Sequence, residues 1–280
     1  MPQLDGKTCL ITGATDGIGR VAAERLGEMG AQLVLVGRNK TKGAEVGAAL
    51  KARGIAVEFL YADLSSMAEI RRLAGEIRRT VERIDVLLLN AGAIFDRRAT
   101  TPEGLERTFA LNHMGYFLTA NLLLDLVRKA AEARIVAVAS EAHRGATLDL
   151  ADLQCEQRYS AWRAYQRSKL MNILFVRELA RRLAGSGVTA NAVHPGFVAS
   201  AFGDRNGVLF RIAIGLAKRV SAITPQAGGS RLVHVAAAPE LAGVTGRYFR
   251  NNRESTPTAE ARNDELASRL WAESARIAGL

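Results

Sequence analysis

The sequence predicts an α/β fold in which a doubly wound, mainly parallel sheet is flanked by helices. Short β-branched runs alternate with longer amphipathic stretches along nearly the whole 280-residue chain, which is the pattern of repeated βαβ units. Several of the short runs are almost continuously apolar, as expected of strands that helices cover on both faces.

Seven runs have the length and composition of strands, so we expect a seven-stranded sheet. They are residues 8–11, 32–36, 56–61, 86–89, 134–139, 189–193 and 247–249. Between the first two runs, apolar residues recur at helical spacing from Ile18 to Met29, and Gly30 follows as a stop signal. No repeat or low-complexity linker marks a boundary, and we therefore expect one domain over residues 1–280.

Composition indicates a globular, cytoplasmic protein. The chain is 48% hydrophobic, but it has no signal sequence and no apolar run near the ~20 residues of a membrane span. Cys9 and Cys155 lack the spacing of a metal site or a disulfide framework, so no metal is expected.

The net charge of +10 admits a nucleic acid, an anionic membrane surface or an anionic ligand as partner. The basic residues are dispersed, however, and in residues 69–83 Arg and Glu are interspersed, which is typical of a solvated helix face. Because no recognised nucleic-acid motif accompanies the charge, we expect no nucleic-acid partner.

The least regular stretch covers residues 197–224. A long excursion in a compact α/β domain is usually a binding loop or a lid, and we predict a substrate-binding lid here. Its apolar side chains, Phe197, Phe202, Leu209 and Phe210, would cover a hydrophobic substrate or form a subunit contact.

A helix is expected to carry Tyr165 and Lys169 and to continue through an apolar run from Leu170 to Val176. The run is apolar around nearly its whole circumference. One face must cover the sheet, and the remainder predicts a second covered face. Either another subunit or a loop of the same chain could supply the cover, and we favour a homodimer or homotetramer.

Tyr165 and Lys169 lie one helical turn apart, so their side chains share a face. A free tyrosine titrates near pH ~10 and is a poor acid or base at neutral pH until a nearby positive charge favours its phenolate. The pair is therefore a candidate acid/base. Taken alone, the two residues could also be an interface aromatic and a solvated lysine, because short motifs often match by chance.

A glycine-rich turn, TGATDGIG at residues 12–19, joins the first predicted strand to its helix. Glycines permit a tight turn and a close approach of the backbone to a pyrophosphate, and the helix N-terminus offers unpaired N–H groups to the anion. Three residues separate the first two glycines, a wider spacing than in the usual dinucleotide fingerprint.

The glycine spacing and the motifs that follow it resemble the short-chain dehydrogenase/reductase family. Those motifs are an NAG tripeptide at 90–92, Asn112, Ser140, the YxxxK motif at 165–169 and a Pro-Gly pair at 195–196. The resemblance covers the whole chain and implies a Rossmann fold and an oxidoreductase that interconverts a carbonyl and an alcohol. Each motif falls at the C-terminal end of a strand or in the adjoining helix, where open parallel sheets bind ligands.

The resemblance implies four catalytic residues. Tyr165 would be the general acid/base, and Lys169 would hold the nicotinamide ribose and favour the tyrosinate. Ser140 would hydrogen-bond the substrate oxygen, and Asn112 would support a water-linked proton relay. Such a set suits carbonyl reduction, because the developing alkoxide needs a proton donor and an oriented hydrogen bond. Ser140 as a strand-end cap and Asn112 as a packing residue are the structural alternatives.

The same resemblance implies the cofactor-binding residues. They are Gly13, Thr15, Asp16, Gly17, Ile18, Gly19, Arg38, Asp63, Leu64, Asn90, Ala91, Gly92, Tyr165, Lys169, Pro195, Gly196, Val198 and Ser200. At the end of the second strand an acid usually binds the ribose 2′-hydroxyl of NAD, whereas an arginine accommodates a 2′-phosphate. Arg38 stands there without an acid beside it, so NADP(H) is favoured over NAD(H). Asp63 resembles the family's adenine-contacting aspartate.

Two further stretches, around His143 and Trp271, resemble the retinol dehydrogenase-like subgroup and its soluble bacterial relatives. Unlike the membrane-bound retinol enzymes, the chain is expected to have no N-terminal anchor. His143 would line the substrate cleft or pack beside the active-site strand. We expect a hydrophobic alcohol, aldehyde or ketone as substrate. The alternative function, a catalytically silent dinucleotide-binding redox sensor, would not need the intact Tyr, Lys, Ser and Asn set.

Overall fold

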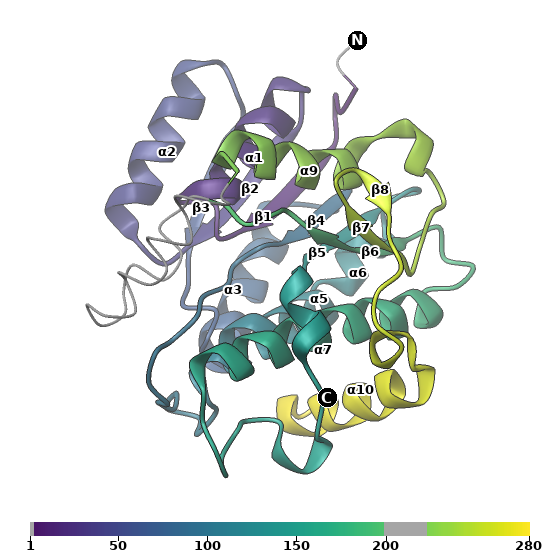
Figure 1. Cartoon of the computed structure of the whole chain (residues 1–280). Coiled ribbons are helices and arrows are strands. Elements are labelled where there is room, and N and C mark those ends of the chain that lie inside the picture. The colour runs from purple at the N-terminus through teal and green to yellow at the C-terminus, as the bar shows by residue number, and fades with distance from the viewer. Residues whose placement is uncertain (1–2, 199–222) are drawn as a thin grey trace.

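The computed structural model describes residues 3–198 and 223–280 and places one eight-stranded sheet between layers of helices (Figure 1). The strand order is β3-β2-β1-β4-β5-β6-β7-β8, and every neighbouring pair is parallel except β7 and β8. The order reverses between β1 and β4. This reversal is the switch point at which doubly wound sheets form a ligand crevice.

All seven predicted strands are present, with bounds that shift by at most one residue. The strands are β1 (Thr8–Thr12), β2 (Gln32–Gly37), β3 (Val57–Tyr61), β4 (Val86–Leu89), β5 (Arg134–Val138), β6 (Thr189–His194), β7 (Tyr248–Arg250) and β8 (Arg253–Glu254). The expected count of seven was wrong, because β8 is too short to show a sequence period. Asn251 and Asn252, with φ of 51° and 61°, make the tight turn that pairs β8 with β7.

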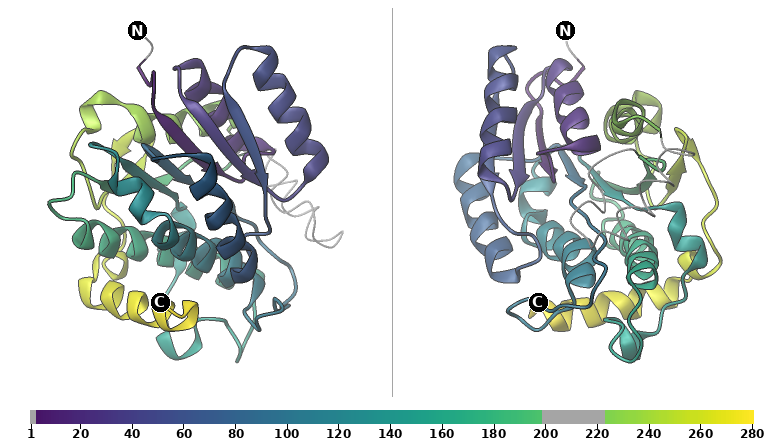
Figure 2. Two further views of the ribbon diagram at one scale, coloured as in Figure 1. Left: turned by 180° about the vertical axis from the view of Figure 1, so that it is seen from behind. Right: turned by 60° about the vertical axis from the view of Figure 1, so that its left-hand side comes forward.

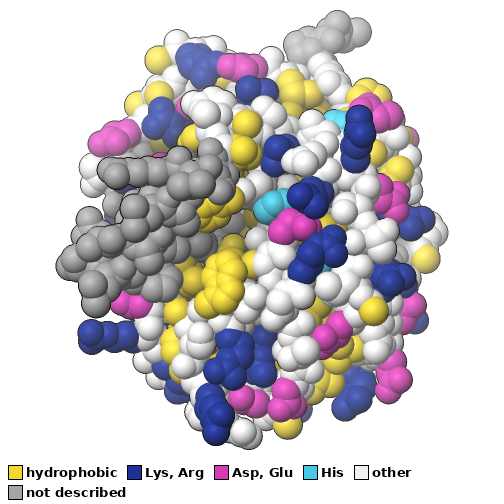
Figure 3. Space-filling view, viewed as in Figure 1, with side chains coloured by type: hydrophobic (Ala, Val, Ile, Leu, Met, Phe, Trp, Pro, Cys, Tyr) yellow, Lys and Arg dark blue, Asp and Glu magenta, His cyan; other side chains and the backbone are white. Residues whose placement is uncertain are grey.

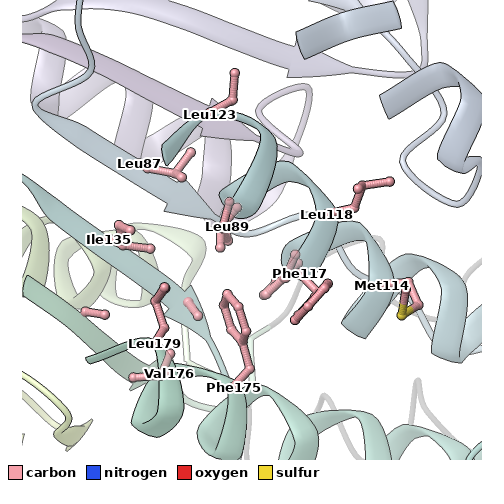
Figure 4. Packing of buried hydrophobic residues seen from close by; sticks show 14 of the residues in the cluster. Leu87, Leu89, Met114, Phe117, Leu118, Leu123, Ile135, Phe175, Val176 and Leu179 are labelled. Atoms are coloured by element: carbon pink, nitrogen blue, oxygen red, sulfur yellow. The ribbon is translucent and has the colours of Figure 1, made fainter. Parts of the chain in front are cut away.

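Helices form two layers, one on each face of the sheet (Figures 1 and 2). One layer holds α1 (Gly17–Glu28), α2 (Lys40–Ala52) and α9 (Pro225–Ala237); the other holds α3 (Met67–Thr80), α4 (Arg107–Phe109), α5 (Gly115–Leu122), α6 (Leu124–Arg128) and α7 (Ala161–Arg182). Alternate strand residues enter opposite layers, which explains the continuous apolar runs. In Figure 4, Leu89 and Ile135 of the sheet face Phe117 of α5 and Phe175 of α7.

The C-terminal helix α10 (Asp264–Ala278) lies along the outer side of α7 (Figure 1). Trp271 of α10 stacks on Phe175, with ring centroids 5.9 Å apart, and meets Phe117 edge-on at 4.9 Å. The predicted second covered face of α7 is therefore real. A helix of the same chain covers it here, rather than the second subunit that we favoured from the sequence.

Charged side chains of both signs are mixed on the face shown in Figure 3, which agrees with the dispersed charge of the sequence. Cys9 and Cys155 are buried free thiols. Within the described ranges, no helix combines the length and the apolar character needed to traverse a bilayer. The same ranges contain no group of three or more His, Cys, Asp or Glu arranged to hold a metal ion.

Candidate functional site

The NAG turn is tied to the glycine-rich turn across the switch point between β1 and β4. The Thr12 hydroxyl accepts hydrogen bonds from the backbone N–H groups of Asn90 (2.9 Å) and Ala91 (3.1 Å). In return, the Asn90 amide donates to the carbonyl oxygens of Thr12 (2.9 Å) and Gly13 (3.1 Å). The two predicted cofactor motifs therefore form one rigid edge.

The glycines of this edge let its two turns pack closely, at positions where a side chain would collide with the neighbouring backbone. Gly13 has φ of +71°, and a Cβ there would lie 2.8 Å from the Cα of Ala91. A Cβ at Gly19 would collide with the carbonyl of Gly13, and Gly17 has φ of 55°. These three glycines form a glycine cradle beside the N-terminus of α1, and this cradle fits the pyrophosphate of a dinucleotide.

Three neighbours of these glycines hold the turn in place. Asp16 caps α1 by accepting the Gly17 N–H at 2.8 Å. A hydrogen bond from the Lys42 ammonium, also at 2.8 Å, lowers the pKa of the Asp16 carboxyl. Thr15 packs against Gly37 of β2, where a Cβ would lie 2.6 Å from its methyl group, and Ile18 packs against α9.

Arg38, at the end of β2, meets Asp63 beyond β3 in an ion pair of 3.4 Å. Burial favours a raised pKa for Asp63, but hydrogen bonds from Ser65 and the charge of Arg38 lower it overall. The next residue, Leu64, is buried. A cavity of about 400 Å³ opens beside the pair, lined by Arg38, Lys40, Tyr61, Ala62, Asp63, Glu69, Arg72 and Glu76.

Tyr165, Lys169 and Ser140 come together at the end of β5. Tyr165 and Ser140 share a side-chain hydrogen bond. The Lys169 Nζ lies 5.6 Å from the centre of the Tyr165 ring and donates to the carbonyl oxygen of Val138 at 3.0 Å. It also lies 3.6 Å from the position that a Cβ would take on Gly92 of the NAG turn. The predicted catalytic and cofactor motifs are thus neighbours.

The electrostatics of this group differ from the sequence-based expectation. Burial raises the pKa of Tyr165 to about 12, although the hydrogen bond with Ser140 opposes this effect. Burial also lowers the pKa of Lys169 to about 7. In the chain by itself, desolvation therefore outweighs any help that Lys169 gives to the tyrosinate. Tyr165 keeps its proton at neutral pH, as a proton donor must.

Asn112 is buried in a π-helical turn, η1 (Ala110–Met114), a feature frequent at functional sites. Its side chain accepts from the Ala93 N–H and donates to the Ala93 carbonyl, both at 2.9 Å. It also donates to Ser168 Oγ at 3.0 Å, and Ser168 donates to the Tyr165 carbonyl at 2.7 Å. The Asn112 amide thus clamps the loop after the NAG turn to the helix that carries Tyr165.

Sequence reasoning missed the supporting residues Ser168 and Asn172. Both are fully buried polar side chains of α7. Asn172 interrupts the apolar run from Leu170 to Val176, and this break was the available signal. Asn172 donates to the carbonyl of Val138 at 3.2 Å, beside the bond from Lys169. Lys169 and Asn172 thus both bind the end of β5 and align α7 with it.

His143 packs behind Ser140 and does not line a substrate cleft. It is fully buried, its ring meets Tyr248 edge-on at 5.1 Å, and its Nδ1 lies 2.7 Å from the carbonyl oxygen of Ser140. The Thr258 N–H donates to Nε2 at 3.4 Å, so Nδ1 carries the proton. Of the two alternatives for His143, the packing role holds.

Pro195 and Gly196 follow β6, and Arg231 of α9 donates to the Pro195 carbonyl at 3.0 Å. Val198 is buried and pairs with Ile223 in an isolated parallel bridge. Ser200, together with most of the predicted lid and its side chains Phe202, Leu209 and Phe210, lies outside the described residues.

The family model described as short chain dehydrogenase matches residues 7–207. The chain belongs to the short-chain dehydrogenases. This short-chain dehydrogenase is 37% identical to retinol dehydrogenase 13 of Homo sapiens, over 99% of the chain and 86% of that protein. It is also 37% identical to polyprenol dehydrogenase of Mus musculus, over 100% of the chain and 86% of that protein.

Solved structures agree with this assignment. An uncharacterized protein from Mycobacterium Paratuberculosis superposes with a TM-score of 0.80 at 31% identity, covering 100% of the chain and 96% of that structure. A Pseudomonas aeruginosa RhlG/NADP active-site complex gives a TM-score of 0.72 at 26% identity, covering 89% and 96%. The resemblance to the retinol dehydrogenase-like subgroup is confirmed.

As a short-chain dehydrogenase, the protein binds a nicotinamide dinucleotide and is an oxidoreductase acting on CH–OH groups. It interconverts a carbonyl and an alcohol. The comparisons give no support to the alternative of a silent redox sensor.

Proposed function

We propose that this short-chain dehydrogenase uses NADP(H) and acts on an extended apolar alcohol and its carbonyl counterpart. The observation that carries the proposal is the hydrogen-bonded pair of Ser140 and Tyr165, with Lys169 buried beneath it, at the same edge as the glycine cradle. We assign the catalysis to this pair because it offers a substrate oxygen two hydroxyl partners.

In the direction of reduction, the substrate carbonyl oxygen would lie between the hydroxyls of Ser140 and Tyr165. A bound nicotinamide dinucleotide would supply the hydride. Tyr165 then donates its proton to the alkoxide oxygen, and burial, which raises its pKa to about 12, keeps that proton in place until the charge develops. Lys169 would hold the ribose, and Asn112 keeps the Tyr165 helix and the NAG loop in register.

The preference for NADP(H) is supported by Arg38 and its cavity, where Lys40 adds a positive charge, whereas Arg72 is paired with Glu69 and Glu76. Among the described residues, Arg38 has one ion pair, a half-exposed contact with Asp63 at 3.4 Å, and such pairs contribute at most about 1 kcal/mol. A 2′-phosphate could therefore replace Asp63 as the partner of the Arg38 guanidinium with little loss of free energy, and it would form stronger, charge-assisted hydrogen bonds.

Substituting Arg38→Gln tests this preference. We expect kcat/KM with NADPH to fall about tenfold, or 1.4 kcal/mol, while kcat/KM with NADH changes little. Lys51→Gln, in the last turn of the same helix α2 that follows Arg38, is the matched control and should leave the ratio of the two unchanged. An unchanged ratio in Arg38→Gln would show that another residue selects the cofactor.

An apolar substrate is supported by the names of two relatives, retinol dehydrogenase and polyprenol dehydrogenase. Incubation with NADPH and a panel of aldehydes and ketones, from butanal to retinal, tests the activity by loss of absorbance at the nicotinamide band. Tyr165→Phe should lower turnover by at least about 10²-fold, because it removes the proton donor. The proposed reaction is refuted if no member of the panel is turned over, or if Tyr165→Phe keeps full activity.

A further inference from the structure

A tryptophan stands exposed beside the catalytic tyrosine. Among the described residues, the large hydrophobic side chains that are exposed are Trp162, at 51%, and the C-terminal Leu280, at 56%. Trp162 lies three positions before Tyr165 on α7, so the two share a helix face. Their rings are stacked, with centroids 5.8 Å apart and planes inclined by 30°.

We propose that Trp162 determines substrate specificity by binding the apolar chain of the substrate on its open ring face. This inference rests on the proposed function, because it takes the substrate oxygen to be held by Tyr165 and Ser140. The oxygen must lie within hydrogen-bond distance of the Tyr165 hydroxyl. A chain that continues several carbons beyond the carbonyl then starts next to the indole ring stacked on that tyrosine.

The energetics favour an apolar occupant. One face of the indole ring is against Tyr165, and about half of the side chain remains in water. An alkyl or polyene chain laid on the open face removes apolar area of both partners from water, which is favourable and needs no directional bond. A short substrate covers less of the ring than a long one, so the gain is larger for extended substrates.

The start of α7, which carries Trp162, is fixed to the loop after the NAG turn. Tyr159, three residues earlier, donates to the Phe95 carbonyl at 2.8 Å and so fixes the loop after the NAG turn beside the start of α7. The Arg107 guanidinium lies 4.2 Å above the Phe95 ring, and Arg163, which follows Trp162, is exposed. The exposed charge of Arg163 disfavours a cationic chain beside Trp162, whereas it does not repel an uncharged apolar chain.

Steady-state kinetics with two aldehydes of different length provide the first test. We compare decanal with butanal, at saturating NADPH, in the wild type, Trp162→Ala, Trp162→Phe and Leu280→Ala. The ratio of kcat/KM for decanal to that for butanal should fall about tenfold in Trp162→Ala, equivalent to 1.4 kcal/mol. The ratio should fall less in Trp162→Phe, which keeps a ring, and should not change in Leu280→Ala, the other exposed apolar residue.

Two kinetic outcomes overturn the inference. An unchanged ratio in Trp162→Ala means that the ring does not bind the chain. Equal losses with decanal and butanal mean that the ring acts only through the position of Tyr165. Trp162 could instead lie in a contact between two copies of the chain, and light scattering of the same variants tests this. A lower molar mass for Trp162→Ala than for the wild type would assign the ring to such a contact and overturn the inference.

Acrylamide quenching of tryptophan fluorescence provides a second test that needs no turnover. The chain has two tryptophans, and Trp271 is only 9% exposed, so the quenching reports mainly on Trp162. With NADPH present, decan-1-ol should protect the fluorescence from acrylamide, and butan-1-ol at the same concentration should not. Protection without turnover of any aldehyde would refute the proposed reaction, and with it the role of Trp162 in specificity, but would still show that the ring binds an apolar chain. Turnover without protection would refute the inference alone.

Discussion

Lys169→Met is expected to stabilise the fold at neutral pH, and to do so less as the pH rises. Burial lowers the pKa of Lys169 from 10.5 in the unfolded chain to about 7 in the fold. Between these two values the unfolded state binds more protons than the folded state, so the stability of the wild type rises with pH. Methionine has a similar apolar stem and no proton to release, and the variant lacks this dependence.

The size of the effect follows from the two pKa values. At 1.36 kcal/mol per pKa unit, the difference between 10.5 and about 7 corresponds to about 5 kcal/mol. The free energy of unfolding of the wild type is lower by this full amount at pH values below 7. At pH 7 the cost of protonation is about 4 kcal/mol and at pH 9 about 2 kcal/mol. The wild type should therefore gain about 2 kcal/mol on the variant between these two pH values. The lost hydrogen bond to Val138 enters both measurements and cancels.

Urea unfolding at pH 7 and pH 9 measures this difference, with the free energy of unfolding taken from the same slope for both proteins. Lys51→Met is the matched control: its side chain is exposed on α2, and its pH profile should run parallel to that of the wild type. Parallel profiles for wild type and Lys169→Met would refute the reasoning, since they would mean that Lys169 titrates alike in both states.

Three further substitutions probe the cradle and the C-terminal helix. Gly13→Ala should cost about 1–2 kcal/mol from its φ of +71° alone and should weaken NADPH binding in a fluorescence titration; unaltered affinity would contradict the cradle. Trp271→Ala should lower the free energy of unfolding by about 3–5 kcal/mol, because it removes the ring that packs on Phe175. If the free energy of unfolding falls no more than it does for a substitution at an exposed position, α10 is not part of the core. In Ser274→Ala, the Nε2 of buried His113 loses its 2.8 Å partner, which should cost about 1–3 kcal/mol in urea unfolding, and Ser230→Ala on the exposed side of α9 serves as control.

The Ser274 prediction depends on a hydrogen-bond direction that the structure fixes. Ser274 donates its own proton to the Leu270 carbonyl at 2.7 Å, so His113 must donate from Nε2. Burial lowers the pKa of His113 to about 3 and keeps the ring neutral. Since His113 follows Asn112 in the π-helical turn, the contact joins α10 directly to the turn that holds Asn112.

Local pattern alone determined most of the architecture and the glycine-rich turn after β1. Strands buried on both faces show as apolar runs, and helices of the cover show a helical period, so their bounds are readable without tertiary information. Glycines at 13, 17 and 19 and the one-turn spacing of Tyr165 and Lys169 are likewise local features, and the structure places them as the sequence predicts.

Only the tertiary structure decided what surrounds those local features. Desolvation set the pKa of Tyr165 and of Lys169, and it depends on groups far apart in the chain. The cover of α7 by α10, from which it is separated by residues 183–263, also has no local signature. Because α7 is apolar around nearly its whole circumference, its outer face must also be buried. Which element buries that face depends on long-range packing. Here the C-terminal helix of the same chain does so with Trp271.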